Sequence, residues 1–531
     1  MQGDKLYLKR NVQAEPLFND WYAVSLLIPP ATSAMFVTNS HLKIMRSYSL
    51  SPELHVAANQ DPAMMGGPFI NYRENRVAEI KALIDKTLTG CAHAIEFADA
   101  VKALDQLLRK EARGHSLEPL YQKVPEALKG YVELVYDLNN NASPRFIEQF
   151  LYSSRFYDVG SQSVGLSLVT EDFRPFVLST PRLDGPGYWK LKVPFADERL
   201  DGLFELKETP RPAGEVKELL GLDGEGGGLL ASLLTDAAPE PKADRRFQGE
   251  GVRVRYYGHA CLLVETKEVS ILTDPFISYE YPSDIPRYTF ADLPDEIDYV
   301  LITHSHLDHI VLEPLLQLRR KIKHIVVPRS GGGFLADPSM KLMLSNVGFK
   351  NVLGLDELET LGVPGGEVTA LPFFGEHHDL NVKGKAAYLV SLNGRRVCVA
   401  ADSCNLETRA AENIRRAFGP LDVLFIGMEC DGAPLSWFYG ALLTRPIDRE
   451  MDYSRKGSGC NYRQAMEMCE ALGSRRVYVY AMGLEPWLTY ILGLNVNEES
   501  KQRVEARAFI EDCRSRGIDS ELLYGQKEIL L

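Results

Sequence analysis

The sequence of 531 residues lacks the features that mark membrane and secreted proteins. It contains no apolar run near the ~20 residues that a membrane-spanning helix requires. Its first residues, MQGDKLYLKRNVQAEP, lack the apolar core of a secretion signal. The eight cysteines are scattered, without a CxxC pair or a dense framework, which is typical of reduced thiols. These absences predict a cytoplasmic protein without membrane contact.

Positive charge is also in short supply. The chain has 59 Lys and Arg against 72 Asp and Glu, a formal net charge of −13. Such a balance argues against nucleic acid as the main partner, because a phosphate-binding surface needs excess cations. It leaves open a small-molecule substrate or a protein partner with basic patches.

The composition changes in the middle of the chain. Residues 221–251 are rich in Gly, Ala, Pro and charge, as linkers are. We therefore predict a domain boundary near residue 245, with an N-terminal mixed α/β domain over residues 1–245 and a second domain over residues 246–531.

The N-terminal domain contains apolar residues at helical spacing as well as short apolar runs typical of strands. Apolar residues at helical spacing predict helices over residues 75–88 and 92–113, and the pattern continues over 119–140. Shorter apolar runs at 163–169 and 187–195 predict strands. Four histidines of this domain stand alone in sequence and are expected to be surface or structural core residues: His41, His55, His93 and His115.

The C-terminal domain has a different order of predicted strands and helices. Short apolar strands recur, first as hairpins and then alternating with helices, as in the runs YVLITH, RRVCVAAD and NYRQAMEMCEALG. This order predicts an α+β fold in which two stacked sheets carry helices on their outer faces.

One segment of this domain concentrates metal-binding side chains. Residues 301–310 read LITHSHLDHI, so an apolar strand runs directly into His304, His306, Asp308 and His309. In extended backbone, alternate residues point the same way, which brings the first two histidines to one side. Four potential ligands at one strand end favour two metal ions over one, and a polar turn with incidental histidines is the weaker alternative.

The HSHLDH segment resembles the H-x-H-x-D-H signature of the metallo-β-lactamase superfamily, which implies an αββα sandwich for residues 246–531. The runs YYGHACLLVE and ILTDPF resemble the opening strands of that family. The resemblance gives Asp274 the role of orienting a ligating histidine, with a simple turn as the alternative. His259 of the GHA triplet is expected to be structural, with contact to a ligand as the alternative.

The same resemblance implies ligands at later strand ends. Glu376 stands where the family usually has histidine, followed by His377 and His378; if His377 were the ligand, the set would suit a hydrolase. Asp402 matches the aspartate that bridges the two metals, although it could instead cap a helix. The family's last histidine is missing, since Met482 and Gly483 occupy its region.

The expected donors are therefore His304, His306, Asp308, His309, Glu376 and Asp402. Replacing imidazole by carboxylate makes a site harder and more anionic, and a carboxylate-rich pair with a few histidines is typical of dinuclear iron. The ligand set thus points to two iron ions with molecular oxygen as co-substrate.

The full length, with its long N-terminal region and the glutamate of FFGEHHDL, resembles the dinuclear-iron β-hydroxylases of the chloramphenicol-biosynthesis type. That resemblance implies hydroxylation of the β-carbon of an amino acid, L-p-aminophenylalanine in the namesake. The amino acid is held on the phosphopantetheine arm of a nonribosomal peptide synthetase carrier domain. It also implies an external electron donor and a homodimer formed through the N-terminal domain.

Two alternatives remain: a dinuclear zinc hydrolase of lactonase or phosphodiesterase type, and a lactamase-fold protein without catalysis. Among other segments, residues 427–440 are expected to form a loop over the site, and Glu429 either contacts a metal-bound group or ends a strand. Residues 485–490 are expected to be core. The basic segments 315–323 and 455–463 are candidates for carrier docking, but a solvated charged face is the simpler interpretation.

Overall fold

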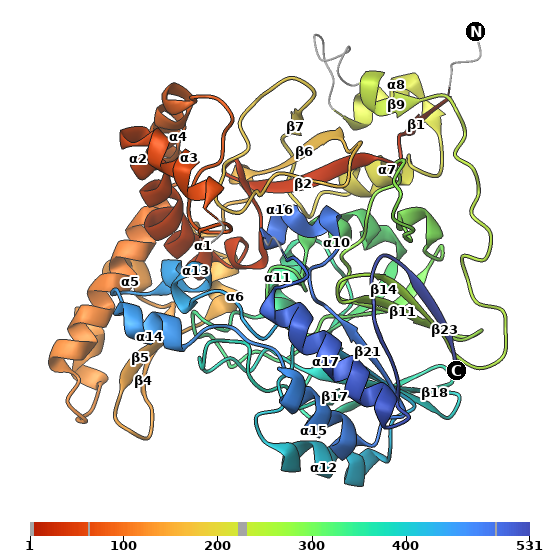
Figure 1. The fold of residues 1–531 in the computed structure, drawn as a ribbon. Coiled ribbons are helices and arrows are strands. Elements are labelled where there is room, and N and C mark those ends of the chain that lie inside the picture. The colour runs from red at the N-terminus through yellow and green to blue at the C-terminus, as the bar shows by residue number, and fades with distance from the viewer. Residues whose placement is uncertain (1–4, 62–63, 221–230, 494–495) are drawn as a thin grey trace.

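The computed structural model of the protein describes residues 5–61, 64–220, 231–493 and 496–531. Residues 221–230 of the predicted linker lie outside these ranges. Figure 1 shows the C-terminal half as a sandwich, with the N-terminal elements packed along one side of it. In the described ranges, no helix has the length and apolar character needed to cross a bilayer.

Two seven-stranded sheets form the sandwich. The first has the order β15-β14-β13-β12-β11-β10-β23, and it contains β10 (Arg253–Gly258), β11 (Cys261–Glu265), β12 (Ser270–Thr273), β13 (Ile297–Leu301), β14 (Ile322–Pro328), β15 (Val352–Leu355) and β23 (Lys527–Leu530). Strands β12 to β15 are parallel. Their side chains are mostly buried, as expected of parallel strands covered on both faces.

The second sheet has the order β16-β17-β18-β19-β20-β21-β22. It contains β16 (Thr360–Val363), β17 (Gly366–Leu371), β18 (Ala387–Leu392), β19 (Arg395–Val399), β20 (Val423–Gly427), β21 (Arg476–Tyr480) and β22 (Asp519–Leu522). One apolar core lies between the sheets, with side chains such as Val254, Ile271, Val390 and Phe425. The predicted αββα sandwich is confirmed.

Helices cover both outer faces. Helices α12 (Thr408–Phe418), α15 (Tyr462–Leu472) and α17 (Lys501–Ser515) pack on the second sheet through a separate core. Helices α10 (Leu312–Leu318) and α11 (Met340–Asn346) cover the first sheet. Short helices α13 (Leu435–Phe438), α14 (Arg449–Ser454) and α16 (Thr489–Leu492) lie in the connections.

The N-terminal part has three small sheets. One has the order β3-β2-β6-β7, one β8-β1-β9, and β4 pairs with β5. Their bounds are β1 (Lys5–Leu8), β2 (Val12–Phe18), β3 (Trp21–Tyr22), β4 (Val132–Tyr136), β5 (Ala142–Phe146), β6 (Gln162–Leu168), β7 (Trp189–Leu191), β8 (Arg211–Pro212) and β9 (Leu234–Thr235).

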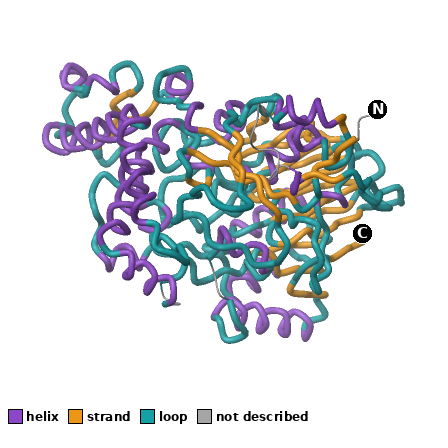
Figure 2. Tube along the Cα trace, turned by 90° about the horizontal axis from the view of Figure 1, so that it is seen from above, coloured by secondary structure: helices purple, strands orange, loops and turns teal. Residues whose placement is uncertain are grey.

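The helices of this part are concentrated in its first half. They are α1 (Pro30–Phe36), α2 (Leu42–Leu50), α3 (Pro52–Gln60), α4 (Val77–Gly90), α5 (Ala92–Glu111), α6 (Glu148–Tyr152), α7 (Arg199–Glu205) and α8 (Ala213–Leu219). Figure 1 shows α1 to α5 gathered at one side of the molecule, whereas α7 and α8 lie near β1 and β9. Figure 2, a view from above, shows a group of helices at one side of the molecule and most strands at the other. A π-helical turn, Val37–His41, joins α1 to α2.

The helix predicted over residues 119–140 is wrong beyond its first turns. Only 3-10 turns form at Glu118–Lys123 and Glu126–Leu128, and β4 and β5 then make a hairpin. Asp137 closes the turn, because its side chain accepts hydrogen bonds from the backbone N–H groups of Asn139 and Asn141, at 2.8 Å each. The turn formed by Asp137 and the two valines and tyrosine of β4 therefore favoured a hairpin over the helix predicted from apolar spacing.

The N-terminal part shares a core with the first sheet. Phe97 of α5 and Val164 of β6 belong to the same apolar cluster as Leu272 of β12 and Leu315 of α10. The two parts are therefore held together mainly by apolar packing rather than by the covalent linker, because each part buries apolar surface against the other.

A buried ionic network reinforces this contact at helix α10. Arg174 donates to both carboxylate oxygens of Glu313, each at 3.1 Å, and lies 3.4 Å from Glu15. The hydroxyls of Tyr22 and Tyr279 also donate to Glu313, at 2.9 and 2.7 Å. Burial opposes the charge of Glu15, but Arg182 and Arg174 bring the pKa of its carboxyl below the ordinary value.

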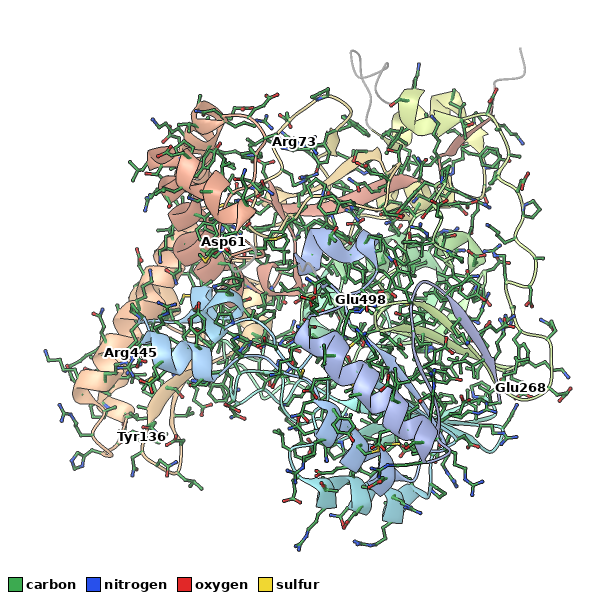
Figure 3. All side chains as sticks on the ribbon, in the orientation of Figure 1. Asp61, Arg73, Tyr136, Glu268, Arg445 and Glu498 are labelled. Atoms are coloured by element: carbon green, nitrogen blue, oxygen red, sulfur yellow. The ribbon has the colours of Figure 1, made fainter. Side chains whose placement is uncertain are left out.

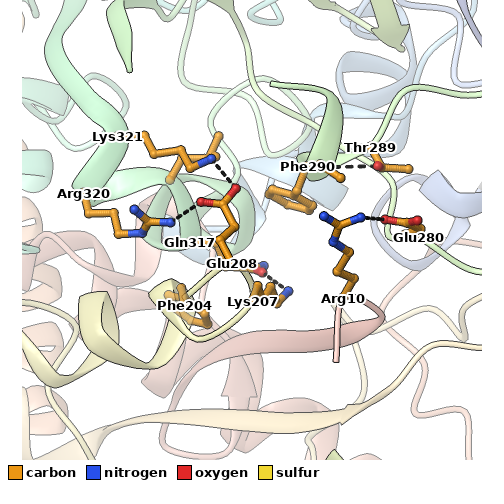
Figure 4. Close-up of a pocket in the computed structure, with 12 residues that line it drawn as sticks. Arg10, Phe204, Lys207, Glu208, Glu280, Thr289, Phe290, Gln317, Arg320 and Lys321 are labelled. Carbon is orange, nitrogen blue, oxygen red and sulfur yellow. Dashed lines mark hydrogen bonds and ion pairs between the residues drawn. The ribbon is translucent and has the colours of Figure 1, made fainter. Parts of the chain in front are cut away.

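The network continues at the far end of α10, in the small cavity of about 40 Å³ shown in Figure 4. Lys207 donates to the Gln317 side chain at 2.7 Å and to the Val12 carbonyl at 2.8 Å. Burial lowers the pKa of Lys207 to about 7. Beside it, Glu208 pairs with Arg320 and Lys321, at 2.6 and 2.7 Å. The cations of Arg320 and Lys321 are thus both paired with Glu208, although Arg320 remains exposed.

Arg174→Leu is expected to lower the free energy of unfolding by about 3–5 kcal/mol, because it leaves the buried carboxylate of Glu313 without its paired cation and leaves Glu15 with Arg182 alone. Thermal and denaturant unfolding measure the effect. Arg463→Leu is the control, since the pair of Arg463 with Glu467 is exposed and worth at most ~1 kcal/mol. Equal effects of the two substitutions would contradict the role assigned to the buried network.

Candidate metal centre

The predicted ligands converge where strands of both sheets end. His304, His306, Asp308 and His309 follow β13, Glu376 follows β17, and Asp402 follows β19. His304 and His309 have no exposed surface, and Asp402 is 6% exposed. Asp402 is not a helix cap, because Glu407 caps α12.

The backbone is strained around this site. Positive φ angles occur at His259, Asp274, Glu376, Ala401 and Ala481, which all lie at strand ends or in the turn beyond β17. A residue other than glycine in this conformation costs about 1–3 kcal/mol and persists only where its surroundings impose it. The strain therefore coincides with the candidate ligands and their neighbours.

Asp274 sets the orientation of two imidazoles. It accepts hydrogen bonds from the backbone N–H and the hydroxyl of Thr303, at 2.8 and 2.6 Å. Its Oδ2 lies 2.9 Å from Nδ1 of His309. The Thr303 hydroxyl, with its single proton given to Asp274, accepts from Nδ1 of His304 at 3.0 Å. Both rings thereby keep Nε2 free, as metal ligands require.

The free nitrogens meet Asp402. Its Oδ2 lies 2.8 Å from Nε2 of His309 and 3.6 Å from Nε2 of His304. Among the described residues, neither of these nitrogens nor Oδ1 of Asp402 has a hydrogen-bond partner. A β-carbon at Gly427 would lie 2.6 Å from Oδ1 of Asp402, so the strand beside it needs glycine. Buried, unpartnered donor atoms that face one another fit a cation.

A second group of donors adjoins the first. His259, Asp308 and His309 each offer one atom within 4.8 Å of the others. Nε2 of His259 lies 3.0 Å from Oδ2 of Asp308. His259 thus contacts a candidate ligand, which is the alternative that the sequence left open beside a structural role. The sequence could not decide between the two, because a lone histidine does not show which side chain it meets in the fold.

The Glu376 turn completes the site. Oε1 of Glu376 lies 3.4 Å from Nδ1 of His306. A β-carbon at Gly457 would lie 3.0 Å from that same oxygen, so segment 457–459 passes directly over the carboxylate. His377 turns elsewhere: its Nδ1 lies 2.8 Å from Nε2 of His306, on the far side of that ring. Glu376 rather than His377 thus faces the Nδ1 side of His306, and His377 supports the ring from behind.

Burial and the closeness of several carboxylates shift the pKa values of the side chains in the site. Burial, with Asp402 and Glu429 nearby, raises the pKa of Glu376 well above its ordinary value. Burial and the carboxylates of Asp308 and Asp402 raise the pKa of Glu429 to about 8. Burial opposes the charge of His309, yet Asp402 and Asp308 raise its pKa well above normal. Bound cations would relieve this crowding of acidic groups.

Segment 427–440 covers the site as expected. The Phe438 ring lies 4.5 Å from the His306 ring, between centroids, and the Tyr439 hydroxyl lies 3.2 Å from Nδ1 of His377. Thr444, just beyond this segment, donates to Asp105 of α5 at 2.9 Å; Figure 3 labels the adjacent Arg445 on that side of the molecule. The N-terminal part thus contacts the chain next to segment 427–440 and helps to hold that segment over the site.

The remaining sequence candidates are accounted for. Met482 is buried and its sulfur accepts from the backbone N–H of Met428 at 3.3 Å. Trp487, Leu488 and Tyr490 are buried, so residues 485–490 are core. In segment 455–463, Arg455 donates to the His378 carbonyl at 2.9 Å, and the cations of Lys456 and Arg463 pair with acidic neighbours.

Comparison with known proteins identifies the family. Residues 7–239 match the diiron non-heme β-hydroxylase N-terminal domain, and residues 253–436 match a β-lactamase superfamily domain. The 4-amino-L-phenylalanyl-[CmlP-peptidyl-carrier-protein] 3-hydroxylase of Streptomyces venezuelae is 38% identical over 530 residues, 99% of each chain. The chain belongs to the diiron β-hydroxylases.

Solved structures agree with this placement. The crystal structure of CmlA, a diiron β-hydroxylase from Streptomyces venezuelae, matches with a TM-score of 0.93 and 37% identity, covering 100% of both chains.

A UPF0173 metal-dependent hydrolase of Thermococcus kodakarensis is 27% identical over only 184 residues, 33% of this chain and 71% of that protein. The hydrolase alternative therefore has only distant support, and the enzyme is a diiron hydroxylase of the non-heme type.

Asp274→Asn is expected to weaken iron binding by about 10–100-fold, because His309 loses the acceptor that fixes its ring. Titration of the metal-free hydroxylase with ferrous iron under anaerobic conditions measures the dissociation constant. Asp298→Asn is the control, since Asp298 lies in β13 of the same sheet but accepts from the backbone N–H of Ser270. An unchanged constant for Asp274→Asn would remove this residue from the support of the site.

Proposed function

We propose that the hydroxylase inserts one oxygen atom from O2 into the β-carbon–hydrogen bond of an amino acid. The amino acid is held as a thioester on the phosphopantetheine arm of a nonribosomal peptide synthetase carrier domain. The full-length identity to a 4-amino-L-phenylalanyl-carrier-protein hydroxylase carries this proposal and favours L-p-aminophenylalanine as the aminoacyl group. The reaction would serve antibiotic biosynthesis of the chloramphenicol type.

The residues that would hold the two iron ions are His304, His306, Asp308, His309, Glu376 and Asp402. Three imidazoles and three carboxylates suit iron better than a histidine-dominated zinc set. When bound, the iron pair supplies the redox chemistry that activates O2. The second oxygen atom leaves as water, with two protons and two electrons from an external donor.

The surrounding side chains hold this arrangement. Asp274 and Thr303 fix the rings of His304 and His309, and His377 fixes that of His306. Glu429, which has a raised pKa, is placed to hold a proton beside the acidic ligands. Phe373 and Phe438 pack on His304 and His306, at 5.1 and 4.5 Å between ring centroids, and keep bulk water away.

The domain organisation is also part of the proposal. We place the boundary near residue 245, between the two matched segments that end at 239 and begin at 253. Residues 1–245 would carry homodimerisation and partner contacts. Leu50, Leu54 and Val56 of α2 and α3 support this role, being 83%, 65% and 41% exposed. All eight cysteines are free thiols, which agrees with a reducing cytoplasm.

Labelled oxygen tests the reaction. With ¹⁸O2, a reduced donor and carrier-bound 4-amino-L-phenylalanine, the product is expected to gain one ¹⁸O atom, with about two irons per chain by metal analysis. Label from H2¹⁸O instead, or two tightly held zinc ions with hydrolytic activity, would overturn the proposal. The free amino acid serves as the control, and its equal turnover would refute the carrier requirement.

Glu376→Gln tests the proposed glutamate ligand. The substitution keeps the side chain's size but removes its charge, so we expect loss of about one iron per chain or a clear change of the iron spectrum. Glu367→Gln, an exposed position on β17, is the matched control. An unaltered iron content and spectrum in Glu376→Gln would exclude this carboxylate from coordination.

A further inference from the structure

The turn that carries Glu376 is strained and belongs to no helix or strand. β17 ends at Leu371 and β18 begins at Ala387, so the turn lies in the connection between them. The φ angles of Gly375 and Glu376 are both positive, 76° and 64°. The backbone N–H of His377 donates to the Gly375 carbonyl at 2.9 Å, which closes a γ-turn centred on Glu376. A γ-turn with positive φ at its centre is rare and strained, so contacts from outside must hold it.

Lys385 supplies such a contact. Its Nζ donates to the Gly375 carbonyl at 3.1 Å, the same oxygen that closes the γ-turn. Gly375 directly precedes Glu376, so this bond acts on the peptide group that sets the direction of the glutamate. Burial lowers the pKa of Lys385, and Glu376 is the acidic residue that most opposes this shift. The ammonium thus lies close to the ligand turn, and it forms no ion pair with any described residue.

The backbone of Lys385 is joined to another of the proposed ligands. Lys385 forms an antiparallel bridge with His304. The N–H of the next residue, Ala386, donates to the Thr303 carbonyl at 2.8 Å. One residue therefore connects the segment of His304, which follows β13 of the first sheet, with the turn of Glu376, which follows β17 of the second sheet.

The Lys385 side chain is held in place, unlike an ordinary surface lysine. Its Nζ lies 5.7 Å from the centroid of the Phe373 ring, within the range of a cation–π contact. The same ring packs on His304, with 5.1 Å between centroids. Lys383, two residues earlier, shows the alternative, because its ammonium pairs with Asp356 at 2.7 Å and its side chain is 51% exposed. The contact of Lys385 with the turn is therefore specific to this position.

We propose that Lys385 positions the carboxylate of Glu376 for iron: its ammonium fixes the γ-turn through the Gly375 carbonyl, and its backbone joins that turn to His304. This inference rests on the proposed function, since it takes Glu376 as an iron ligand. Lys385 is thus a positioning residue that acts through Glu376, and it is not a ligand itself. Its loss should loosen the site without removing a donor atom.

Iron binding tests the proposal without turnover. Lys385→Met keeps an unbranched side chain but removes the donor, so the γ-turn loses its bond to the ammonium. Titration of the metal-free protein with ferrous iron under anaerobic conditions should show that one of the two irons binds about 10–100-fold more weakly. The Mössbauer spectrum of the protein loaded with excess iron should show one altered iron site, as expected for Glu376→Gln.

Lys383→Met is the matched control, because Lys383 lies in the same connection and its ammonium pairs with Asp356 on the surface. It should leave the iron affinity and the spectrum unchanged. An unaltered iron affinity and spectrum in Lys385→Met would overturn the proposal. A lower melting temperature with an unaltered spectrum would overturn it too, since Lys385 would then support the fold rather than the ligand.

A double-mutant cycle shows whether Lys385 acts through Glu376. Residues that act as one unit give effects that do not add. Adding Lys385→Met to Glu376→Ala should therefore weaken iron binding further by about twofold at most. A further loss as large as the one that Lys385→Met causes in the wild-type protein would overturn the proposal, because Lys385 would then act on another part of the site.

The same measurements separate this inference from the proposed function. If Glu376→Gln alters the iron spectrum and Lys385→Met does not, the inference fails alone. If neither substitution alters it, the proposed ligand set fails and the inference fails with it. If the iron-loaded enzyme does not hydroxylate the carrier-bound amino acid, the proposed reaction fails, and the iron measurements still decide the role of Lys385.

Discussion

The orientation of two imidazoles by one buried aspartate is the constraint on which the site depends. Asp274 joins the ends of β12 and β13 by accepting from Thr303 and lying against Nδ1 of His309. Through the Thr303 hydroxyl it also directs His304. The unpaired Nε2 atoms of both rings then face Asp402, which comes from the other sheet. Contacts within the first sheet thereby place donor atoms at a site between the two sheets. The positive φ of Asp274 is the conformational cost of holding its side chain in these contacts.

The chemistry of the site follows from how many carboxylates share it. Burial, together with the carboxylates around them, raises the pKa of Glu376 and Glu429, which without cations drives both toward their protonated forms. The chain accepts this repulsion together with a strained turn at Glu376 and a glycine, Gly457, pressed against its carboxylate. So much strain in one place is reasonable only if bound metal offsets it. In the proposed function, the glutamate at the position where the superfamily usually has histidine would be the feature that favours oxygen chemistry over hydrolysis.

The sequence predicted the sandwich and the region of the metal ligands because both depend on local patterns: apolar strands of fixed length, and donors placed directly at strand ends. It failed where a long-range contact decides. The run at 119–140 has helical spacing, but Asp137 closes a hairpin there. His259 stands alone in sequence, and only the fold brings it to 3.0 Å from Asp308.

The two parts of the chain act as one enzyme because the ligand turn is fastened at both ends by the N-terminal part. Ser25 holds the carbonyl of Ser305 within the turn, and Arg174 and Tyr22 hold Glu313 in the helix that follows it. The N-terminal part therefore limits the movement of the turn that carries four of the proposed ligands, because each end of that turn is bonded to buried side chains of residues 1–245.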